Sequence, residues 1–592
     1  MRYVDEISEA FRNQLALAYR AKDLVAYGLR SKLREGYRMA DFRADLLAGL
    51  VVGVVALPLS MALAIAVDVP PQLGLYTAII AGVIGALLGG TRFQVTGPTA
   101  AFVVVLLPVV HKFGVAGLLL AGAMAGVILV AMGLARLGRL MQFMPHPVTT
   151  GFTAGIAVVI ALLQLKDALG VTPARSDSTF GYLQELWAVR GSVHWYDAAV
   201  CLVTIVLLFG LPRAIKRIPV PLVALVVVSA GVVLVAHLVP GLHATTIGSR
   251  FTTMIGGETV HGIPPLPPLP VVPWHEGTGI ALDYATIRAL LPSAFAIAML
   301  GAIESLMAAV VADGMSGTRH DPNSELIALG IANIVVPFFG GIAATGALAR
   351  TATNIRAGAR SPLAAAFHAV FILACTIILA PLVSYLPMAA LAGLLIVVAW
   401  NMFEVRHFTR LLRVAPRADV MVMLTCFGLT VAFDMVVAVC VGVVLAAFLF
   451  MRRMAVLTNV SLANLDDAQF EVPRGVRVYQ LAGPLFFGAA KTAMEALHTV
   501  GGSDHTVILA MQHVPTIDAT GLVALESALD RLFRSRIKVI FAGLAPEVAE
   551  TLARAGIKRE PGKLAYAPDI DTAISMAIVH AARQPAPAAS AA

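Results

Sequence analysis

Charge is scarce in this sequence. Only 13% of its 592 residues are Asp, Glu, Lys or Arg, while 59% are hydrophobic and the mean hydropathy is +0.85. Soluble globular domains carry roughly 25% charged residues and roughly 45–50% apolar residues. Such a composition excludes an ordinary soluble protein and indicates a polytopic α-helical membrane protein.

Cysteine is equally rare. The sequence has four, each inside an apolar run and without the spacing of metal ligands: Cys201, Cys375, Cys426 and Cys440. This excludes a disulfide framework and a metal site, and we expect no other cofactor and no enzyme. The net charge of +8 is carried at the ends of apolar segments. Because no basic stripe with interleaved aromatics is present, we expect no nucleic-acid partner.

The N-terminal segment lacks a cleavable signal peptide. It is charged and broken into short amphipathic pieces, with no apolar core followed by a small-residue cleavage site. We therefore expect residues 1–43 to remain attached as a cytoplasmic region. Residues 44–455 then form a transmembrane domain, with about fourteen apolar stretches of membrane-crossing or slightly shorter length between Asp45 and Arg452.

Basic residues are dense in every second break between the spans and few or absent in the others. This positive-inside pattern predicts an even number of spans with both termini in the cytoplasm. Two longer breaks, from Lys166 to about Trp195 and from His243 to about Asp283, then lie outside. The second contains GIPPLPPLPVVPW, which is typical of a polyproline-like stretch. The segment from Met402 to Val414 has one apolar and one basic face, which predicts a helix in the cytoplasmic interface.

After Arg453 the long apolar runs give way to shorter segments. Strand-like VRVYQLAGPLFF, TVILAMQHV and IKVIFAGL alternate with helix-like KTAMEALHTV and GLVALESALDRLFRS. The alternation predicts a soluble α/β domain over residues 472–582. Residues 583–592 are small and poor in apolar surface, so we expect a disordered tail.

Two polar stretches interrupt the apolar runs at corresponding places. GGTRFQVTGPTAA, residues 89–101, follows the second span, and GGIAATGALARTA, residues 340–352, follows the ninth. Each begins with paired glycines and continues into Thr-Gly-x-x-Ala, from Thr96 to Ala100 and from Thr345 to Ala349. The stretches are seven spans apart, and seven is odd, so a duplicated unit would be inverted in the membrane. Inverted repeats with broken helices are typical of secondary transporters.

The residue types in these stretches suit an anion site. A helix that begins inside the bilayer leaves its first N–H groups unpaired, which is costly in lipid but useful beside a bound anion. Gly97 lets the backbone approach closely, and Pro98 fits a first helical turn. The hydroxyls of Thr96, Thr99 and Thr345 add donors. The alternative is that the glycines serve only close helix packing.

Two charged residues lie within the predicted spans. Glu304 is part of AFAIAMLGAIESLMAAVV, and Arg350 follows the second Thr-Gly pair. Placing a charged side chain at the centre of a membrane helix costs roughly 2.5–3.5 kcal/mol, so such residues usually have a function. Arg350 has the planar fork that binds carboxylate or sulfate, and Glu304 can pair with it or bind a coupling proton. The alternative is a purely structural ion pair.

Five motifs resemble those of the SulP anion transporters: GPTAAFVV, AMLGAIESL, VAWNMFEV, FDMVVAVCVGVVLA and GPLFFGAA. The resemblance covers nearly the whole chain and is closest to bacterial carriers of four-carbon dicarboxylates. It implies core and gate domains built from inverted repeats of seven spans, about 44–240 and about 288–455, and a C-terminal STAS domain over 472–582. It also implies proton-coupled uptake of succinate, fumarate or aspartate. The alternative within the family is sulfate or bicarbonate transport, or anion exchange.

The resemblance also implies roles for individual residues. The implied substrate site consists of Ser60, Thr96, Gly97, Pro98, Thr99, Ala100, Thr345, Gly346, Ala349 and Arg350. Glu304 is the implied coupling residue. Relatives that take sodium tend to carry Asp there and Thr four residues on, where this chain has Ala308, which argues against sodium coupling. A homodimer in the inner membrane of a bacterium, working by alternating access, is implied as well.

In the C-terminal domain, VPTIDATGL places Asp518 and Thr520 at a strand-to-helix turn. STAS domains of related bacterial regulators carry a phosphorylated Ser or Thr at this position, whereas the alternative is a helix N-cap. A function of another class is a membrane-anchored STAS domain that signals to, or holds, a cytoplasmic protein. That function leaves Arg350 and Glu304 unexplained. Nucleobase permeases share the fold but lack a STAS domain, which argues against that class.

Overall fold

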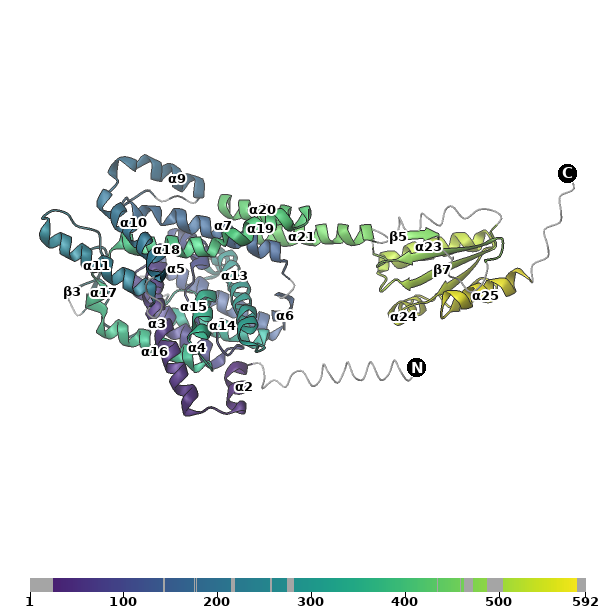
Figure 1. Ribbon diagram of the computed structural model, residues 1–592, viewed down its shortest axis with the longest axis horizontal. Coiled ribbons are helices and arrows are strands. Elements are labelled where there is room, and N and C mark those ends of the chain that lie inside the picture. Colours follow the sequence, from purple (N-terminus) through teal and green to yellow (C-terminus); the bar gives the residue numbers. More distant parts are fainter. Residues whose placement is uncertain are drawn as a thin grey trace. The chain divides into compact units, whose positions relative to one another are not determined.

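The computed structural model describes residues 25–141, 144–174, 176, 178–213, 219–255, 258–273, 282–433, 435–457, 459–462, 472–486 and 504–582. The chain divides into two compact units, Met1–Val443 and Val444–Ala592. The first unit is almost entirely helical, and the second combines a sheet with helices (Figure 1). The predicted tail at 583–592 lies outside the described residues.

The first half of the membrane unit holds seven apolar segments. They are α3 (Met39–Ala66), α4 (Pro71–Leu88), the two parts of α5 (Ala100–Leu134), α7 (His146–Leu163), α10 (Trp195–Gly210) and α11 (Val220–Leu238). α5 holds the third and fourth segments, because Gly114 has non-helical angles (φ 68°, ψ −174°) and divides it. A short helix, α2 (Tyr27–Glu35), precedes them, and α3 begins at Met39, before the predicted boundary at residue 44.

The second half holds seven segments again. They are α13 (Tyr284–Ser316), α14 (Pro322–Val335), α15 (Leu348–Arg356), α16 (Leu363–Ile378), α18 (Met388–Phe403), α20 (Arg417–Ala432) and α21 (Met435–Leu457). Among the described residues, eight helices are long and apolar enough to cross a membrane unaided. The predicted polytopic helical fold with a C-terminal α/β domain is confirmed.

Glycines bring the two halves into close contact. A Cβ atom on Gly126 of α5 would lie 2.6 Å from the carbonyl oxygen of Gly330, and one on Gly330 of α14 would lie 2.7 Å from that of Gly126. Only residues without a side chain permit this approach of two helix backbones. Close helix packing was the alternative role for the glycines of the Thr-Gly stretches. In the structure, Gly126 and Gly330 have this role.

The break between α11 and α13 contains a β-hairpin that the sequence analysis missed. β2 (Thr252–Ile255) pairs antiparallel with β3 (Glu258–His261), and Thr252 lies opposite His261. Both strands precede the proline-rich stretch, whose described residues up to 273 form no helix or strand. Threonine, isoleucine and valine favour extended backbone, so the signal was present but was overshadowed by the prolines that follow.

The C-terminal unit is a five-stranded sheet flanked by helices. The strand order is β5 (Asn459–Leu462), β6 (Val476–Ala482), β7 (Thr506–His513), β8 (Lys538–Ala542) and β9 (Leu564–Ala567). β5 is antiparallel to β6, and the other pairs are parallel. Among the described residues, the helices that flank the sheet are α23 (Ala519–Arg534), α24 (Pro546–Arg554) and α25 (Ile570–Ala581).

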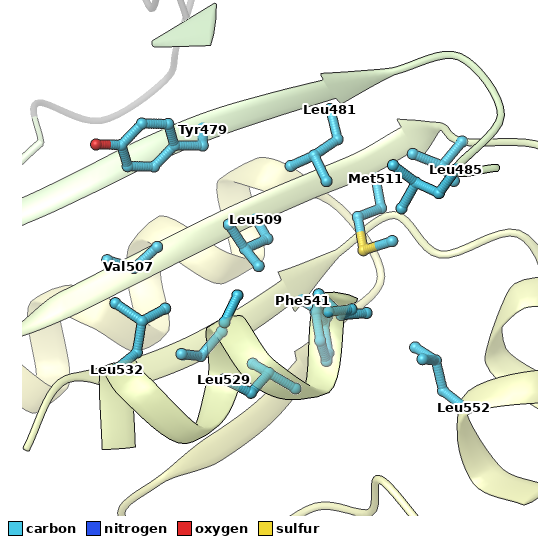
Figure 2. Packing of buried hydrophobic residues seen from close by; sticks show 14 of the residues in the cluster. Tyr479, Leu481, Leu485, Val507, Leu509, Met511, Leu529, Leu532, Phe541 and Leu552 are labelled. Carbon is cyan, nitrogen blue, oxygen red and sulfur yellow. The ribbon is translucent and has the colours of Figure 1, made fainter. Parts of the chain in front are cut away.

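Both faces of this sheet are covered. On one face, Leu509 and Phe541 pack with Leu529, Leu532 and Leu552 from α23 and α24 (Figure 2). On the other face, a second cluster of buried residues includes apolar residues of α25. The central strand β7 is consequently a continuous apolar run, as is typical of parallel strands buried on both sides.

Candidate anion-binding site

The two Thr-Gly stretches lie side by side. β1 (Thr96–Gly97) and β4 (Thr345–Gly346) form an antiparallel pair, with Thr96 opposite Gly346 and Gly97 opposite Thr345. β1 leads into α5, and β4 leads into α15. Equivalent residues of the two halves thus meet in opposite directions, which is the arrangement expected of inverted repeats.

Both helices that follow this pair begin without a side-chain cap. Thr99 is the N-cap residue of α5 and Ala347 that of α15, and neither accepts a hydrogen bond from the first turn of its helix. The first N–H groups of a helix have no partner within the helix, and the helix dipole makes this end positive. Because Thr99 and Ala347 both line one cavity, two positive helix ends meet there.

Arg350 adds a full positive charge to this place. It lies on α15 and is only 2% exposed, and its Nη2 donates to the carbonyl oxygen of Pro98 in the other half. Its Nε and Nη1 have no hydrogen-bond partner among the described residues. A Cβ atom on Gly97 would lie 2.6 Å from Nη1, so any side chain at this position would displace the guanidinium from its place against the backbone.

Glu304 faces the same cavity from α13. Its Oε2 accepts a hydrogen bond of 2.7 Å from the hydroxyl of Thr99. The hydroxyl at the start of α5 therefore donates to Glu304 and leaves the N–H groups of its own helix uncapped. Within the described part of the chain, Glu304 forms no direct ion pair with Arg350, although both line the cavity.

The cavity has a volume of about 690 Å³. Six of the predicted site residues line it: Pro98, Thr99, Ala100, Glu304, Ala349 and Arg350. Its walls also include apolar side chains such as Leu59, Phe152 and Met307. Polar groups in an apolar, partly enclosed space are the usual composition of a site for a small ligand.

The other predicted residues are not part of the cavity lining. Thr96 and Thr345 form the strand pair with the neighbouring glycines, and the Thr345 hydroxyl donates to the carbonyl of Gly301 at 3.0 Å. A Cβ atom on Gly85 of α4 would lie 2.3 Å from the Thr96 hydroxyl, so this side chain faces α4. Ser60 is fully buried with its hydroxyl unpaired, and the structure places it outside the lining.

Glu325 is a buried carboxylate that the sequence analysis missed. It is 2% exposed and accepts hydrogen bonds from the backbone N–H groups of Gly90 and Thr91 at 2.9 and 3.2 Å. Gln94 and Ser305 donate to its other oxygen at 2.7 and 3.2 Å. Glu325 thus links the segment before β1 to Ser305, the residue after Glu304. An acidic residue in the apolar run SELIALGIANIVV was the available signal.

Where α7 begins, the lining includes the exposed residues His146 and Glu404, and we call this part of the cavity its mouth. The mouth is lined by His146 and Thr150 of α7, by Glu404, which follows α18, and by His407 of α19 (Val405–Val414). The rings of His146 and His407 lie 5.2 Å apart. The predicted amphipathic helix, α19, therefore lies beside the mouth.

The opposite end of α7 is joined to the first span by charged groups. Lys166, just beyond α7, donates to Asp68 at 2.5 Å, and His111 of α5 lies 2.9 Å from the other oxygen of Asp68. Burial raises the pKa of the Asp68 carboxyl, but the charge of Lys166 and the contact with His111 outweigh burial, so this pKa lies below its ordinary value. Asp68 therefore stays ionised and ties α3 to α7 at the end away from the mouth.

In the C-terminal unit, Asp518 is the N-cap residue of α23. Its Oδ1 accepts a hydrogen bond of 2.7 Å from the N–H of Gly521. Thr520 lies in the first turn of the helix and is exposed. The geometry supports the capping interpretation for Asp518 and leaves the Thr520 hydroxyl accessible.

Comparisons with solved structures agree with this fold. The structure of SLC26A9 superposes with a TM-score of 0.81 at 18% sequence identity, covering 98% of this chain and 96% of that one. The transmembrane domain of a cyanobacterial bicarbonate transporter, BicA, gives a TM-score of 0.58 at 27% identity, covering 69% of this chain and 98% of that one. At 18% identity the first likeness concerns the fold alone.

Sequence comparisons reach further. The chain is 38% identical over 499 residues to "Putative sulfate transporter YvdB" of Bacillus subtilis, covering 84% of this chain and 90% of that protein. It is 29% identical over 514 residues to the bicarbonate transporter BicA of Picosynechococcus sp., covering 83% of this chain and 87% of that protein. Residues 42–426 match the sulfate permease family, and residues 467–573 match the STAS domain. The chain therefore belongs to the sulfate permease (SulP) family of anion transporters with a C-terminal STAS domain, and it is a transporter rather than an enzyme.

Proposed function

We propose that this protein takes up four-carbon dicarboxylates, such as succinate, fumarate or aspartate, together with protons by alternating access. The observation that supports this proposal most directly is the environment of Arg350. Its buried guanidinium lines the cavity with two nitrogens that have no partner in the part of the chain that the structure describes. A buried cation with unused donors is stabilised when an anion completes its hydrogen bonds.

The cavity offers donors for two carboxylates. One carboxylate can bind Arg350 and the free N–H groups at the starts of α5 and α15. Closer to the mouth, Thr149 and Thr150 line the same cavity beside the ring of His146. The Thr149 hydroxyl donates to the carbonyl oxygen of His146 at 2.8 Å, and the Thr150 hydroxyl lies 3.0 Å from Nδ1 of the same residue. Each hydroxyl must therefore turn away from His146 to donate to a second carboxylate.

Transport of sulfate or bicarbonate is the second candidate, because the similar proteins YvdB and BicA carry those names. Competition in proteoliposomes decides between the two. For a dicarboxylate carrier, unlabelled succinate should block uptake of labelled succinate far better than equal sulfate or bicarbonate. Transport of labelled sulfate or bicarbonate with no flux of succinate would establish the second candidate.

We propose Glu304 as the site of the coupling proton. Its carboxylate lines the cavity and accepts a hydrogen bond from Thr99 at the start of α5. When an anion neutralises Arg350, Glu304 loses an electrostatic partner, and its protonation becomes easier. Substrate and proton then favour each other's binding, as thermodynamic reciprocity requires.

Glu304→Gln tests the coupling, because glutamine resembles the protonated side chain but cannot release a proton. The variant should retain exchange of labelled for unlabelled substrate in proteoliposomes but lose accumulation driven by a pH gradient. Wild-type uptake should rise as the outside pH falls, persist without sodium and collapse with a protonophore. If the variant still concentrates substrate in response to the gradient, Glu304 has only a structural role.

The orientation in the membrane is part of the proposal. Both termini lie in the cytoplasm of a bacterium, so the cavity mouth beside α19 faces the cytoplasm, and the bridge between Asp68 and Lys166 faces outward. Two copies form a homodimer in the inner membrane, and a cytoplasmic protein binds the STAS domain. The alternation of basic residues between the breaks supports the orientation.

A further inference from the structure

α19 is a short helix between two apolar helices of the membrane unit. It begins after Glu404, whose left-handed backbone (φ 45°) ends α18. It ends before Pro416, and α20 starts at the next residue. Since the helices on both sides are membrane segments, this connectivity confines α19 to the boundary between lipid and water.

One side of α19 is fixed to the protein. Phe408 is 7% exposed and packs against Phe403 and Phe427 at ring-centroid distances of 5.3 and 5.7 Å. Ala154 of α7 and Met423 of α20 belong to the same cluster. Apolar contacts with three different helices, α7, α18 and α20, set the rotation of α19 about its own axis.

The opposite side of α19 carries a row of arginines. Arg406, Arg410 and Arg413 are exposed and stand at positions i, i+4 and i+7, which places them on one stripe of the helix, away from Phe408. The side chains of these three arginines form no hydrogen bond or ion pair with another described residue. Arg417 extends the row at the start of α20 and is exposed as well. Unpaired like charges repel one another, so the row is stabilised by external anions.

We propose that this stripe, Arg406, Arg410 and Arg413, binds the headgroups of anionic phospholipids in the adjoining leaflet. The position at the lipid boundary and the charge both fit this ligand. Exposed apolar side chains border the stripe in sequence and suit acyl chains: Trp400 (58% exposed), Val414 (74%) and Met421 (56%). A soluble anion would need the arginines but would gain nothing from this apolar surface.

The stripe is also connected to the cavity. Phe403, Glu404 and His407 line the cavity mouth and lie within or next to α19. A headgroup held by one side of the helix therefore acts on residues at the mouth without contact with the substrate. Anionic lipid bound to the stripe consequently changes the rate of transport, whereas its binding to the stripe needs no substrate.

The binding itself is tested by fluorescence quenching. Trp187, Trp195 and Trp274 are changed to phenylalanine, which leaves Trp400 as the only tryptophan. The protein is placed in vesicles containing brominated phosphatidylglycerol or brominated phosphatidylcholine in increasing mole fraction. Trp400 should be quenched at a lower fraction of the anionic lipid, and each arginine should contribute about fivefold to this preference.

R406Q/R410Q/R413Q should abolish the preference, while the matched triple lysine variant should retain most of it because lysine keeps the charge. R554Q/K558Q/R559Q removes the same charge from exposed positions of the C-terminal unit and should have no effect. Equal quenching by both lipids in the protein with native arginines would overturn the proposal. Retention of the preference by the triple glutamine variant, or displacement of the lipid by soluble glycerol phosphate, would also overturn it.

Discussion

Two helices of the C-terminal unit begin differently from the two half-helices of the membrane unit. In the C-terminal unit, Asp518 and Asp569 cap α23 and α25, each accepting a hydrogen bond of 2.7 Å from a backbone N–H of the first turn. In the membrane unit, α5 and α15 begin at Thr99 and Ala347 without any side-chain cap. The uncapped ends line a cavity together with Arg350, whereas the capped ends belong to a domain packed on its own core.

The difference indicates the role of an uncapped helix N-terminus. A cap supplies an oxygen from the protein itself, so the helix is complete without a ligand. An uncapped end inside the membrane has no water to replace that oxygen and is favourable only when it faces a polar cavity. The absence of a cap at both half-helices therefore supports a ligand that brings its own negatively charged oxygens.

Removing Arg350 should have the largest effect on the membrane site. Hydrogen bonds to charged groups contribute about 1.5–3 kcal/mol each, so Arg350→Ala should weaken anion binding by about a hundredfold or more. Arg350→Lys should retain part of the affinity, because lysine keeps the charge but loses the planar fork. Titration calorimetry of both purified variants gives the comparison. Intact binding in both would show that the two helix ends suffice.

Capping an uncapped end should have the next largest effect. Ala347→Asp places a carboxylate at the start of α15, where it takes up the free N–H groups and repels the substrate. Anion affinity should fall by about tenfold or more, since an internal anion competes with the external one. Ala347→Asn is the matched neutral cap and should weaken binding less. Equal affinity of Ala347→Asp and the wild type would contradict a role of this helix end.

Gly97→Ala should have a moderate effect. The new Cβ atom would lie 2.6 Å from Nη1 of Arg350, and the end of this side chain must shift to make room. Affinity should fall severalfold while folding is retained, because a side-chain end moves more easily than backbone. Gly428→Ala is the control, since a Cβ atom there meets nothing within 4 Å. Both variants are compared by substrate titration and thermal unfolding, and equal affinities would show that Gly97 does not position Arg350.

Removing a cap in the C-terminal unit should have the smallest effect. Asp518→Ala should lower the free energy of unfolding of this unit by about 1 kcal/mol and leave substrate affinity unchanged. We expect a fragment from about residue 470, which lacks the edge strand β5, to fold alone, because the residues of both clusters that cover the sheet lie after residue 470. Urea unfolding of this fragment measures the change. Unchanged stability together with altered transport would indicate a regulatory role instead.

Several features could be predicted from local sequence. The apolar runs, the alternation after Arg453 and the paired Thr-Gly stretches predicted the membrane fold, the α/β domain and the matched half-helices. Glu304 and Arg350 were found because charges are conspicuous in apolar runs. Glu325 has the same property and was missed, since it stands in the first turn after the polar residues before α14.

The sequence by itself determined that this chain crosses the membrane, that its two halves correspond, and which charged residues the spans carry. Those properties depend on the local cost of placing charge and free backbone in lipid. Only the tertiary structure decided that Arg350 reaches Pro98 of the other half, that Glu304 bonds to Thr99, and that Ser60 lies outside the cavity lining. Such contacts join residues far apart in the chain, and they depend on how closely whole helices pack, which no local pattern records.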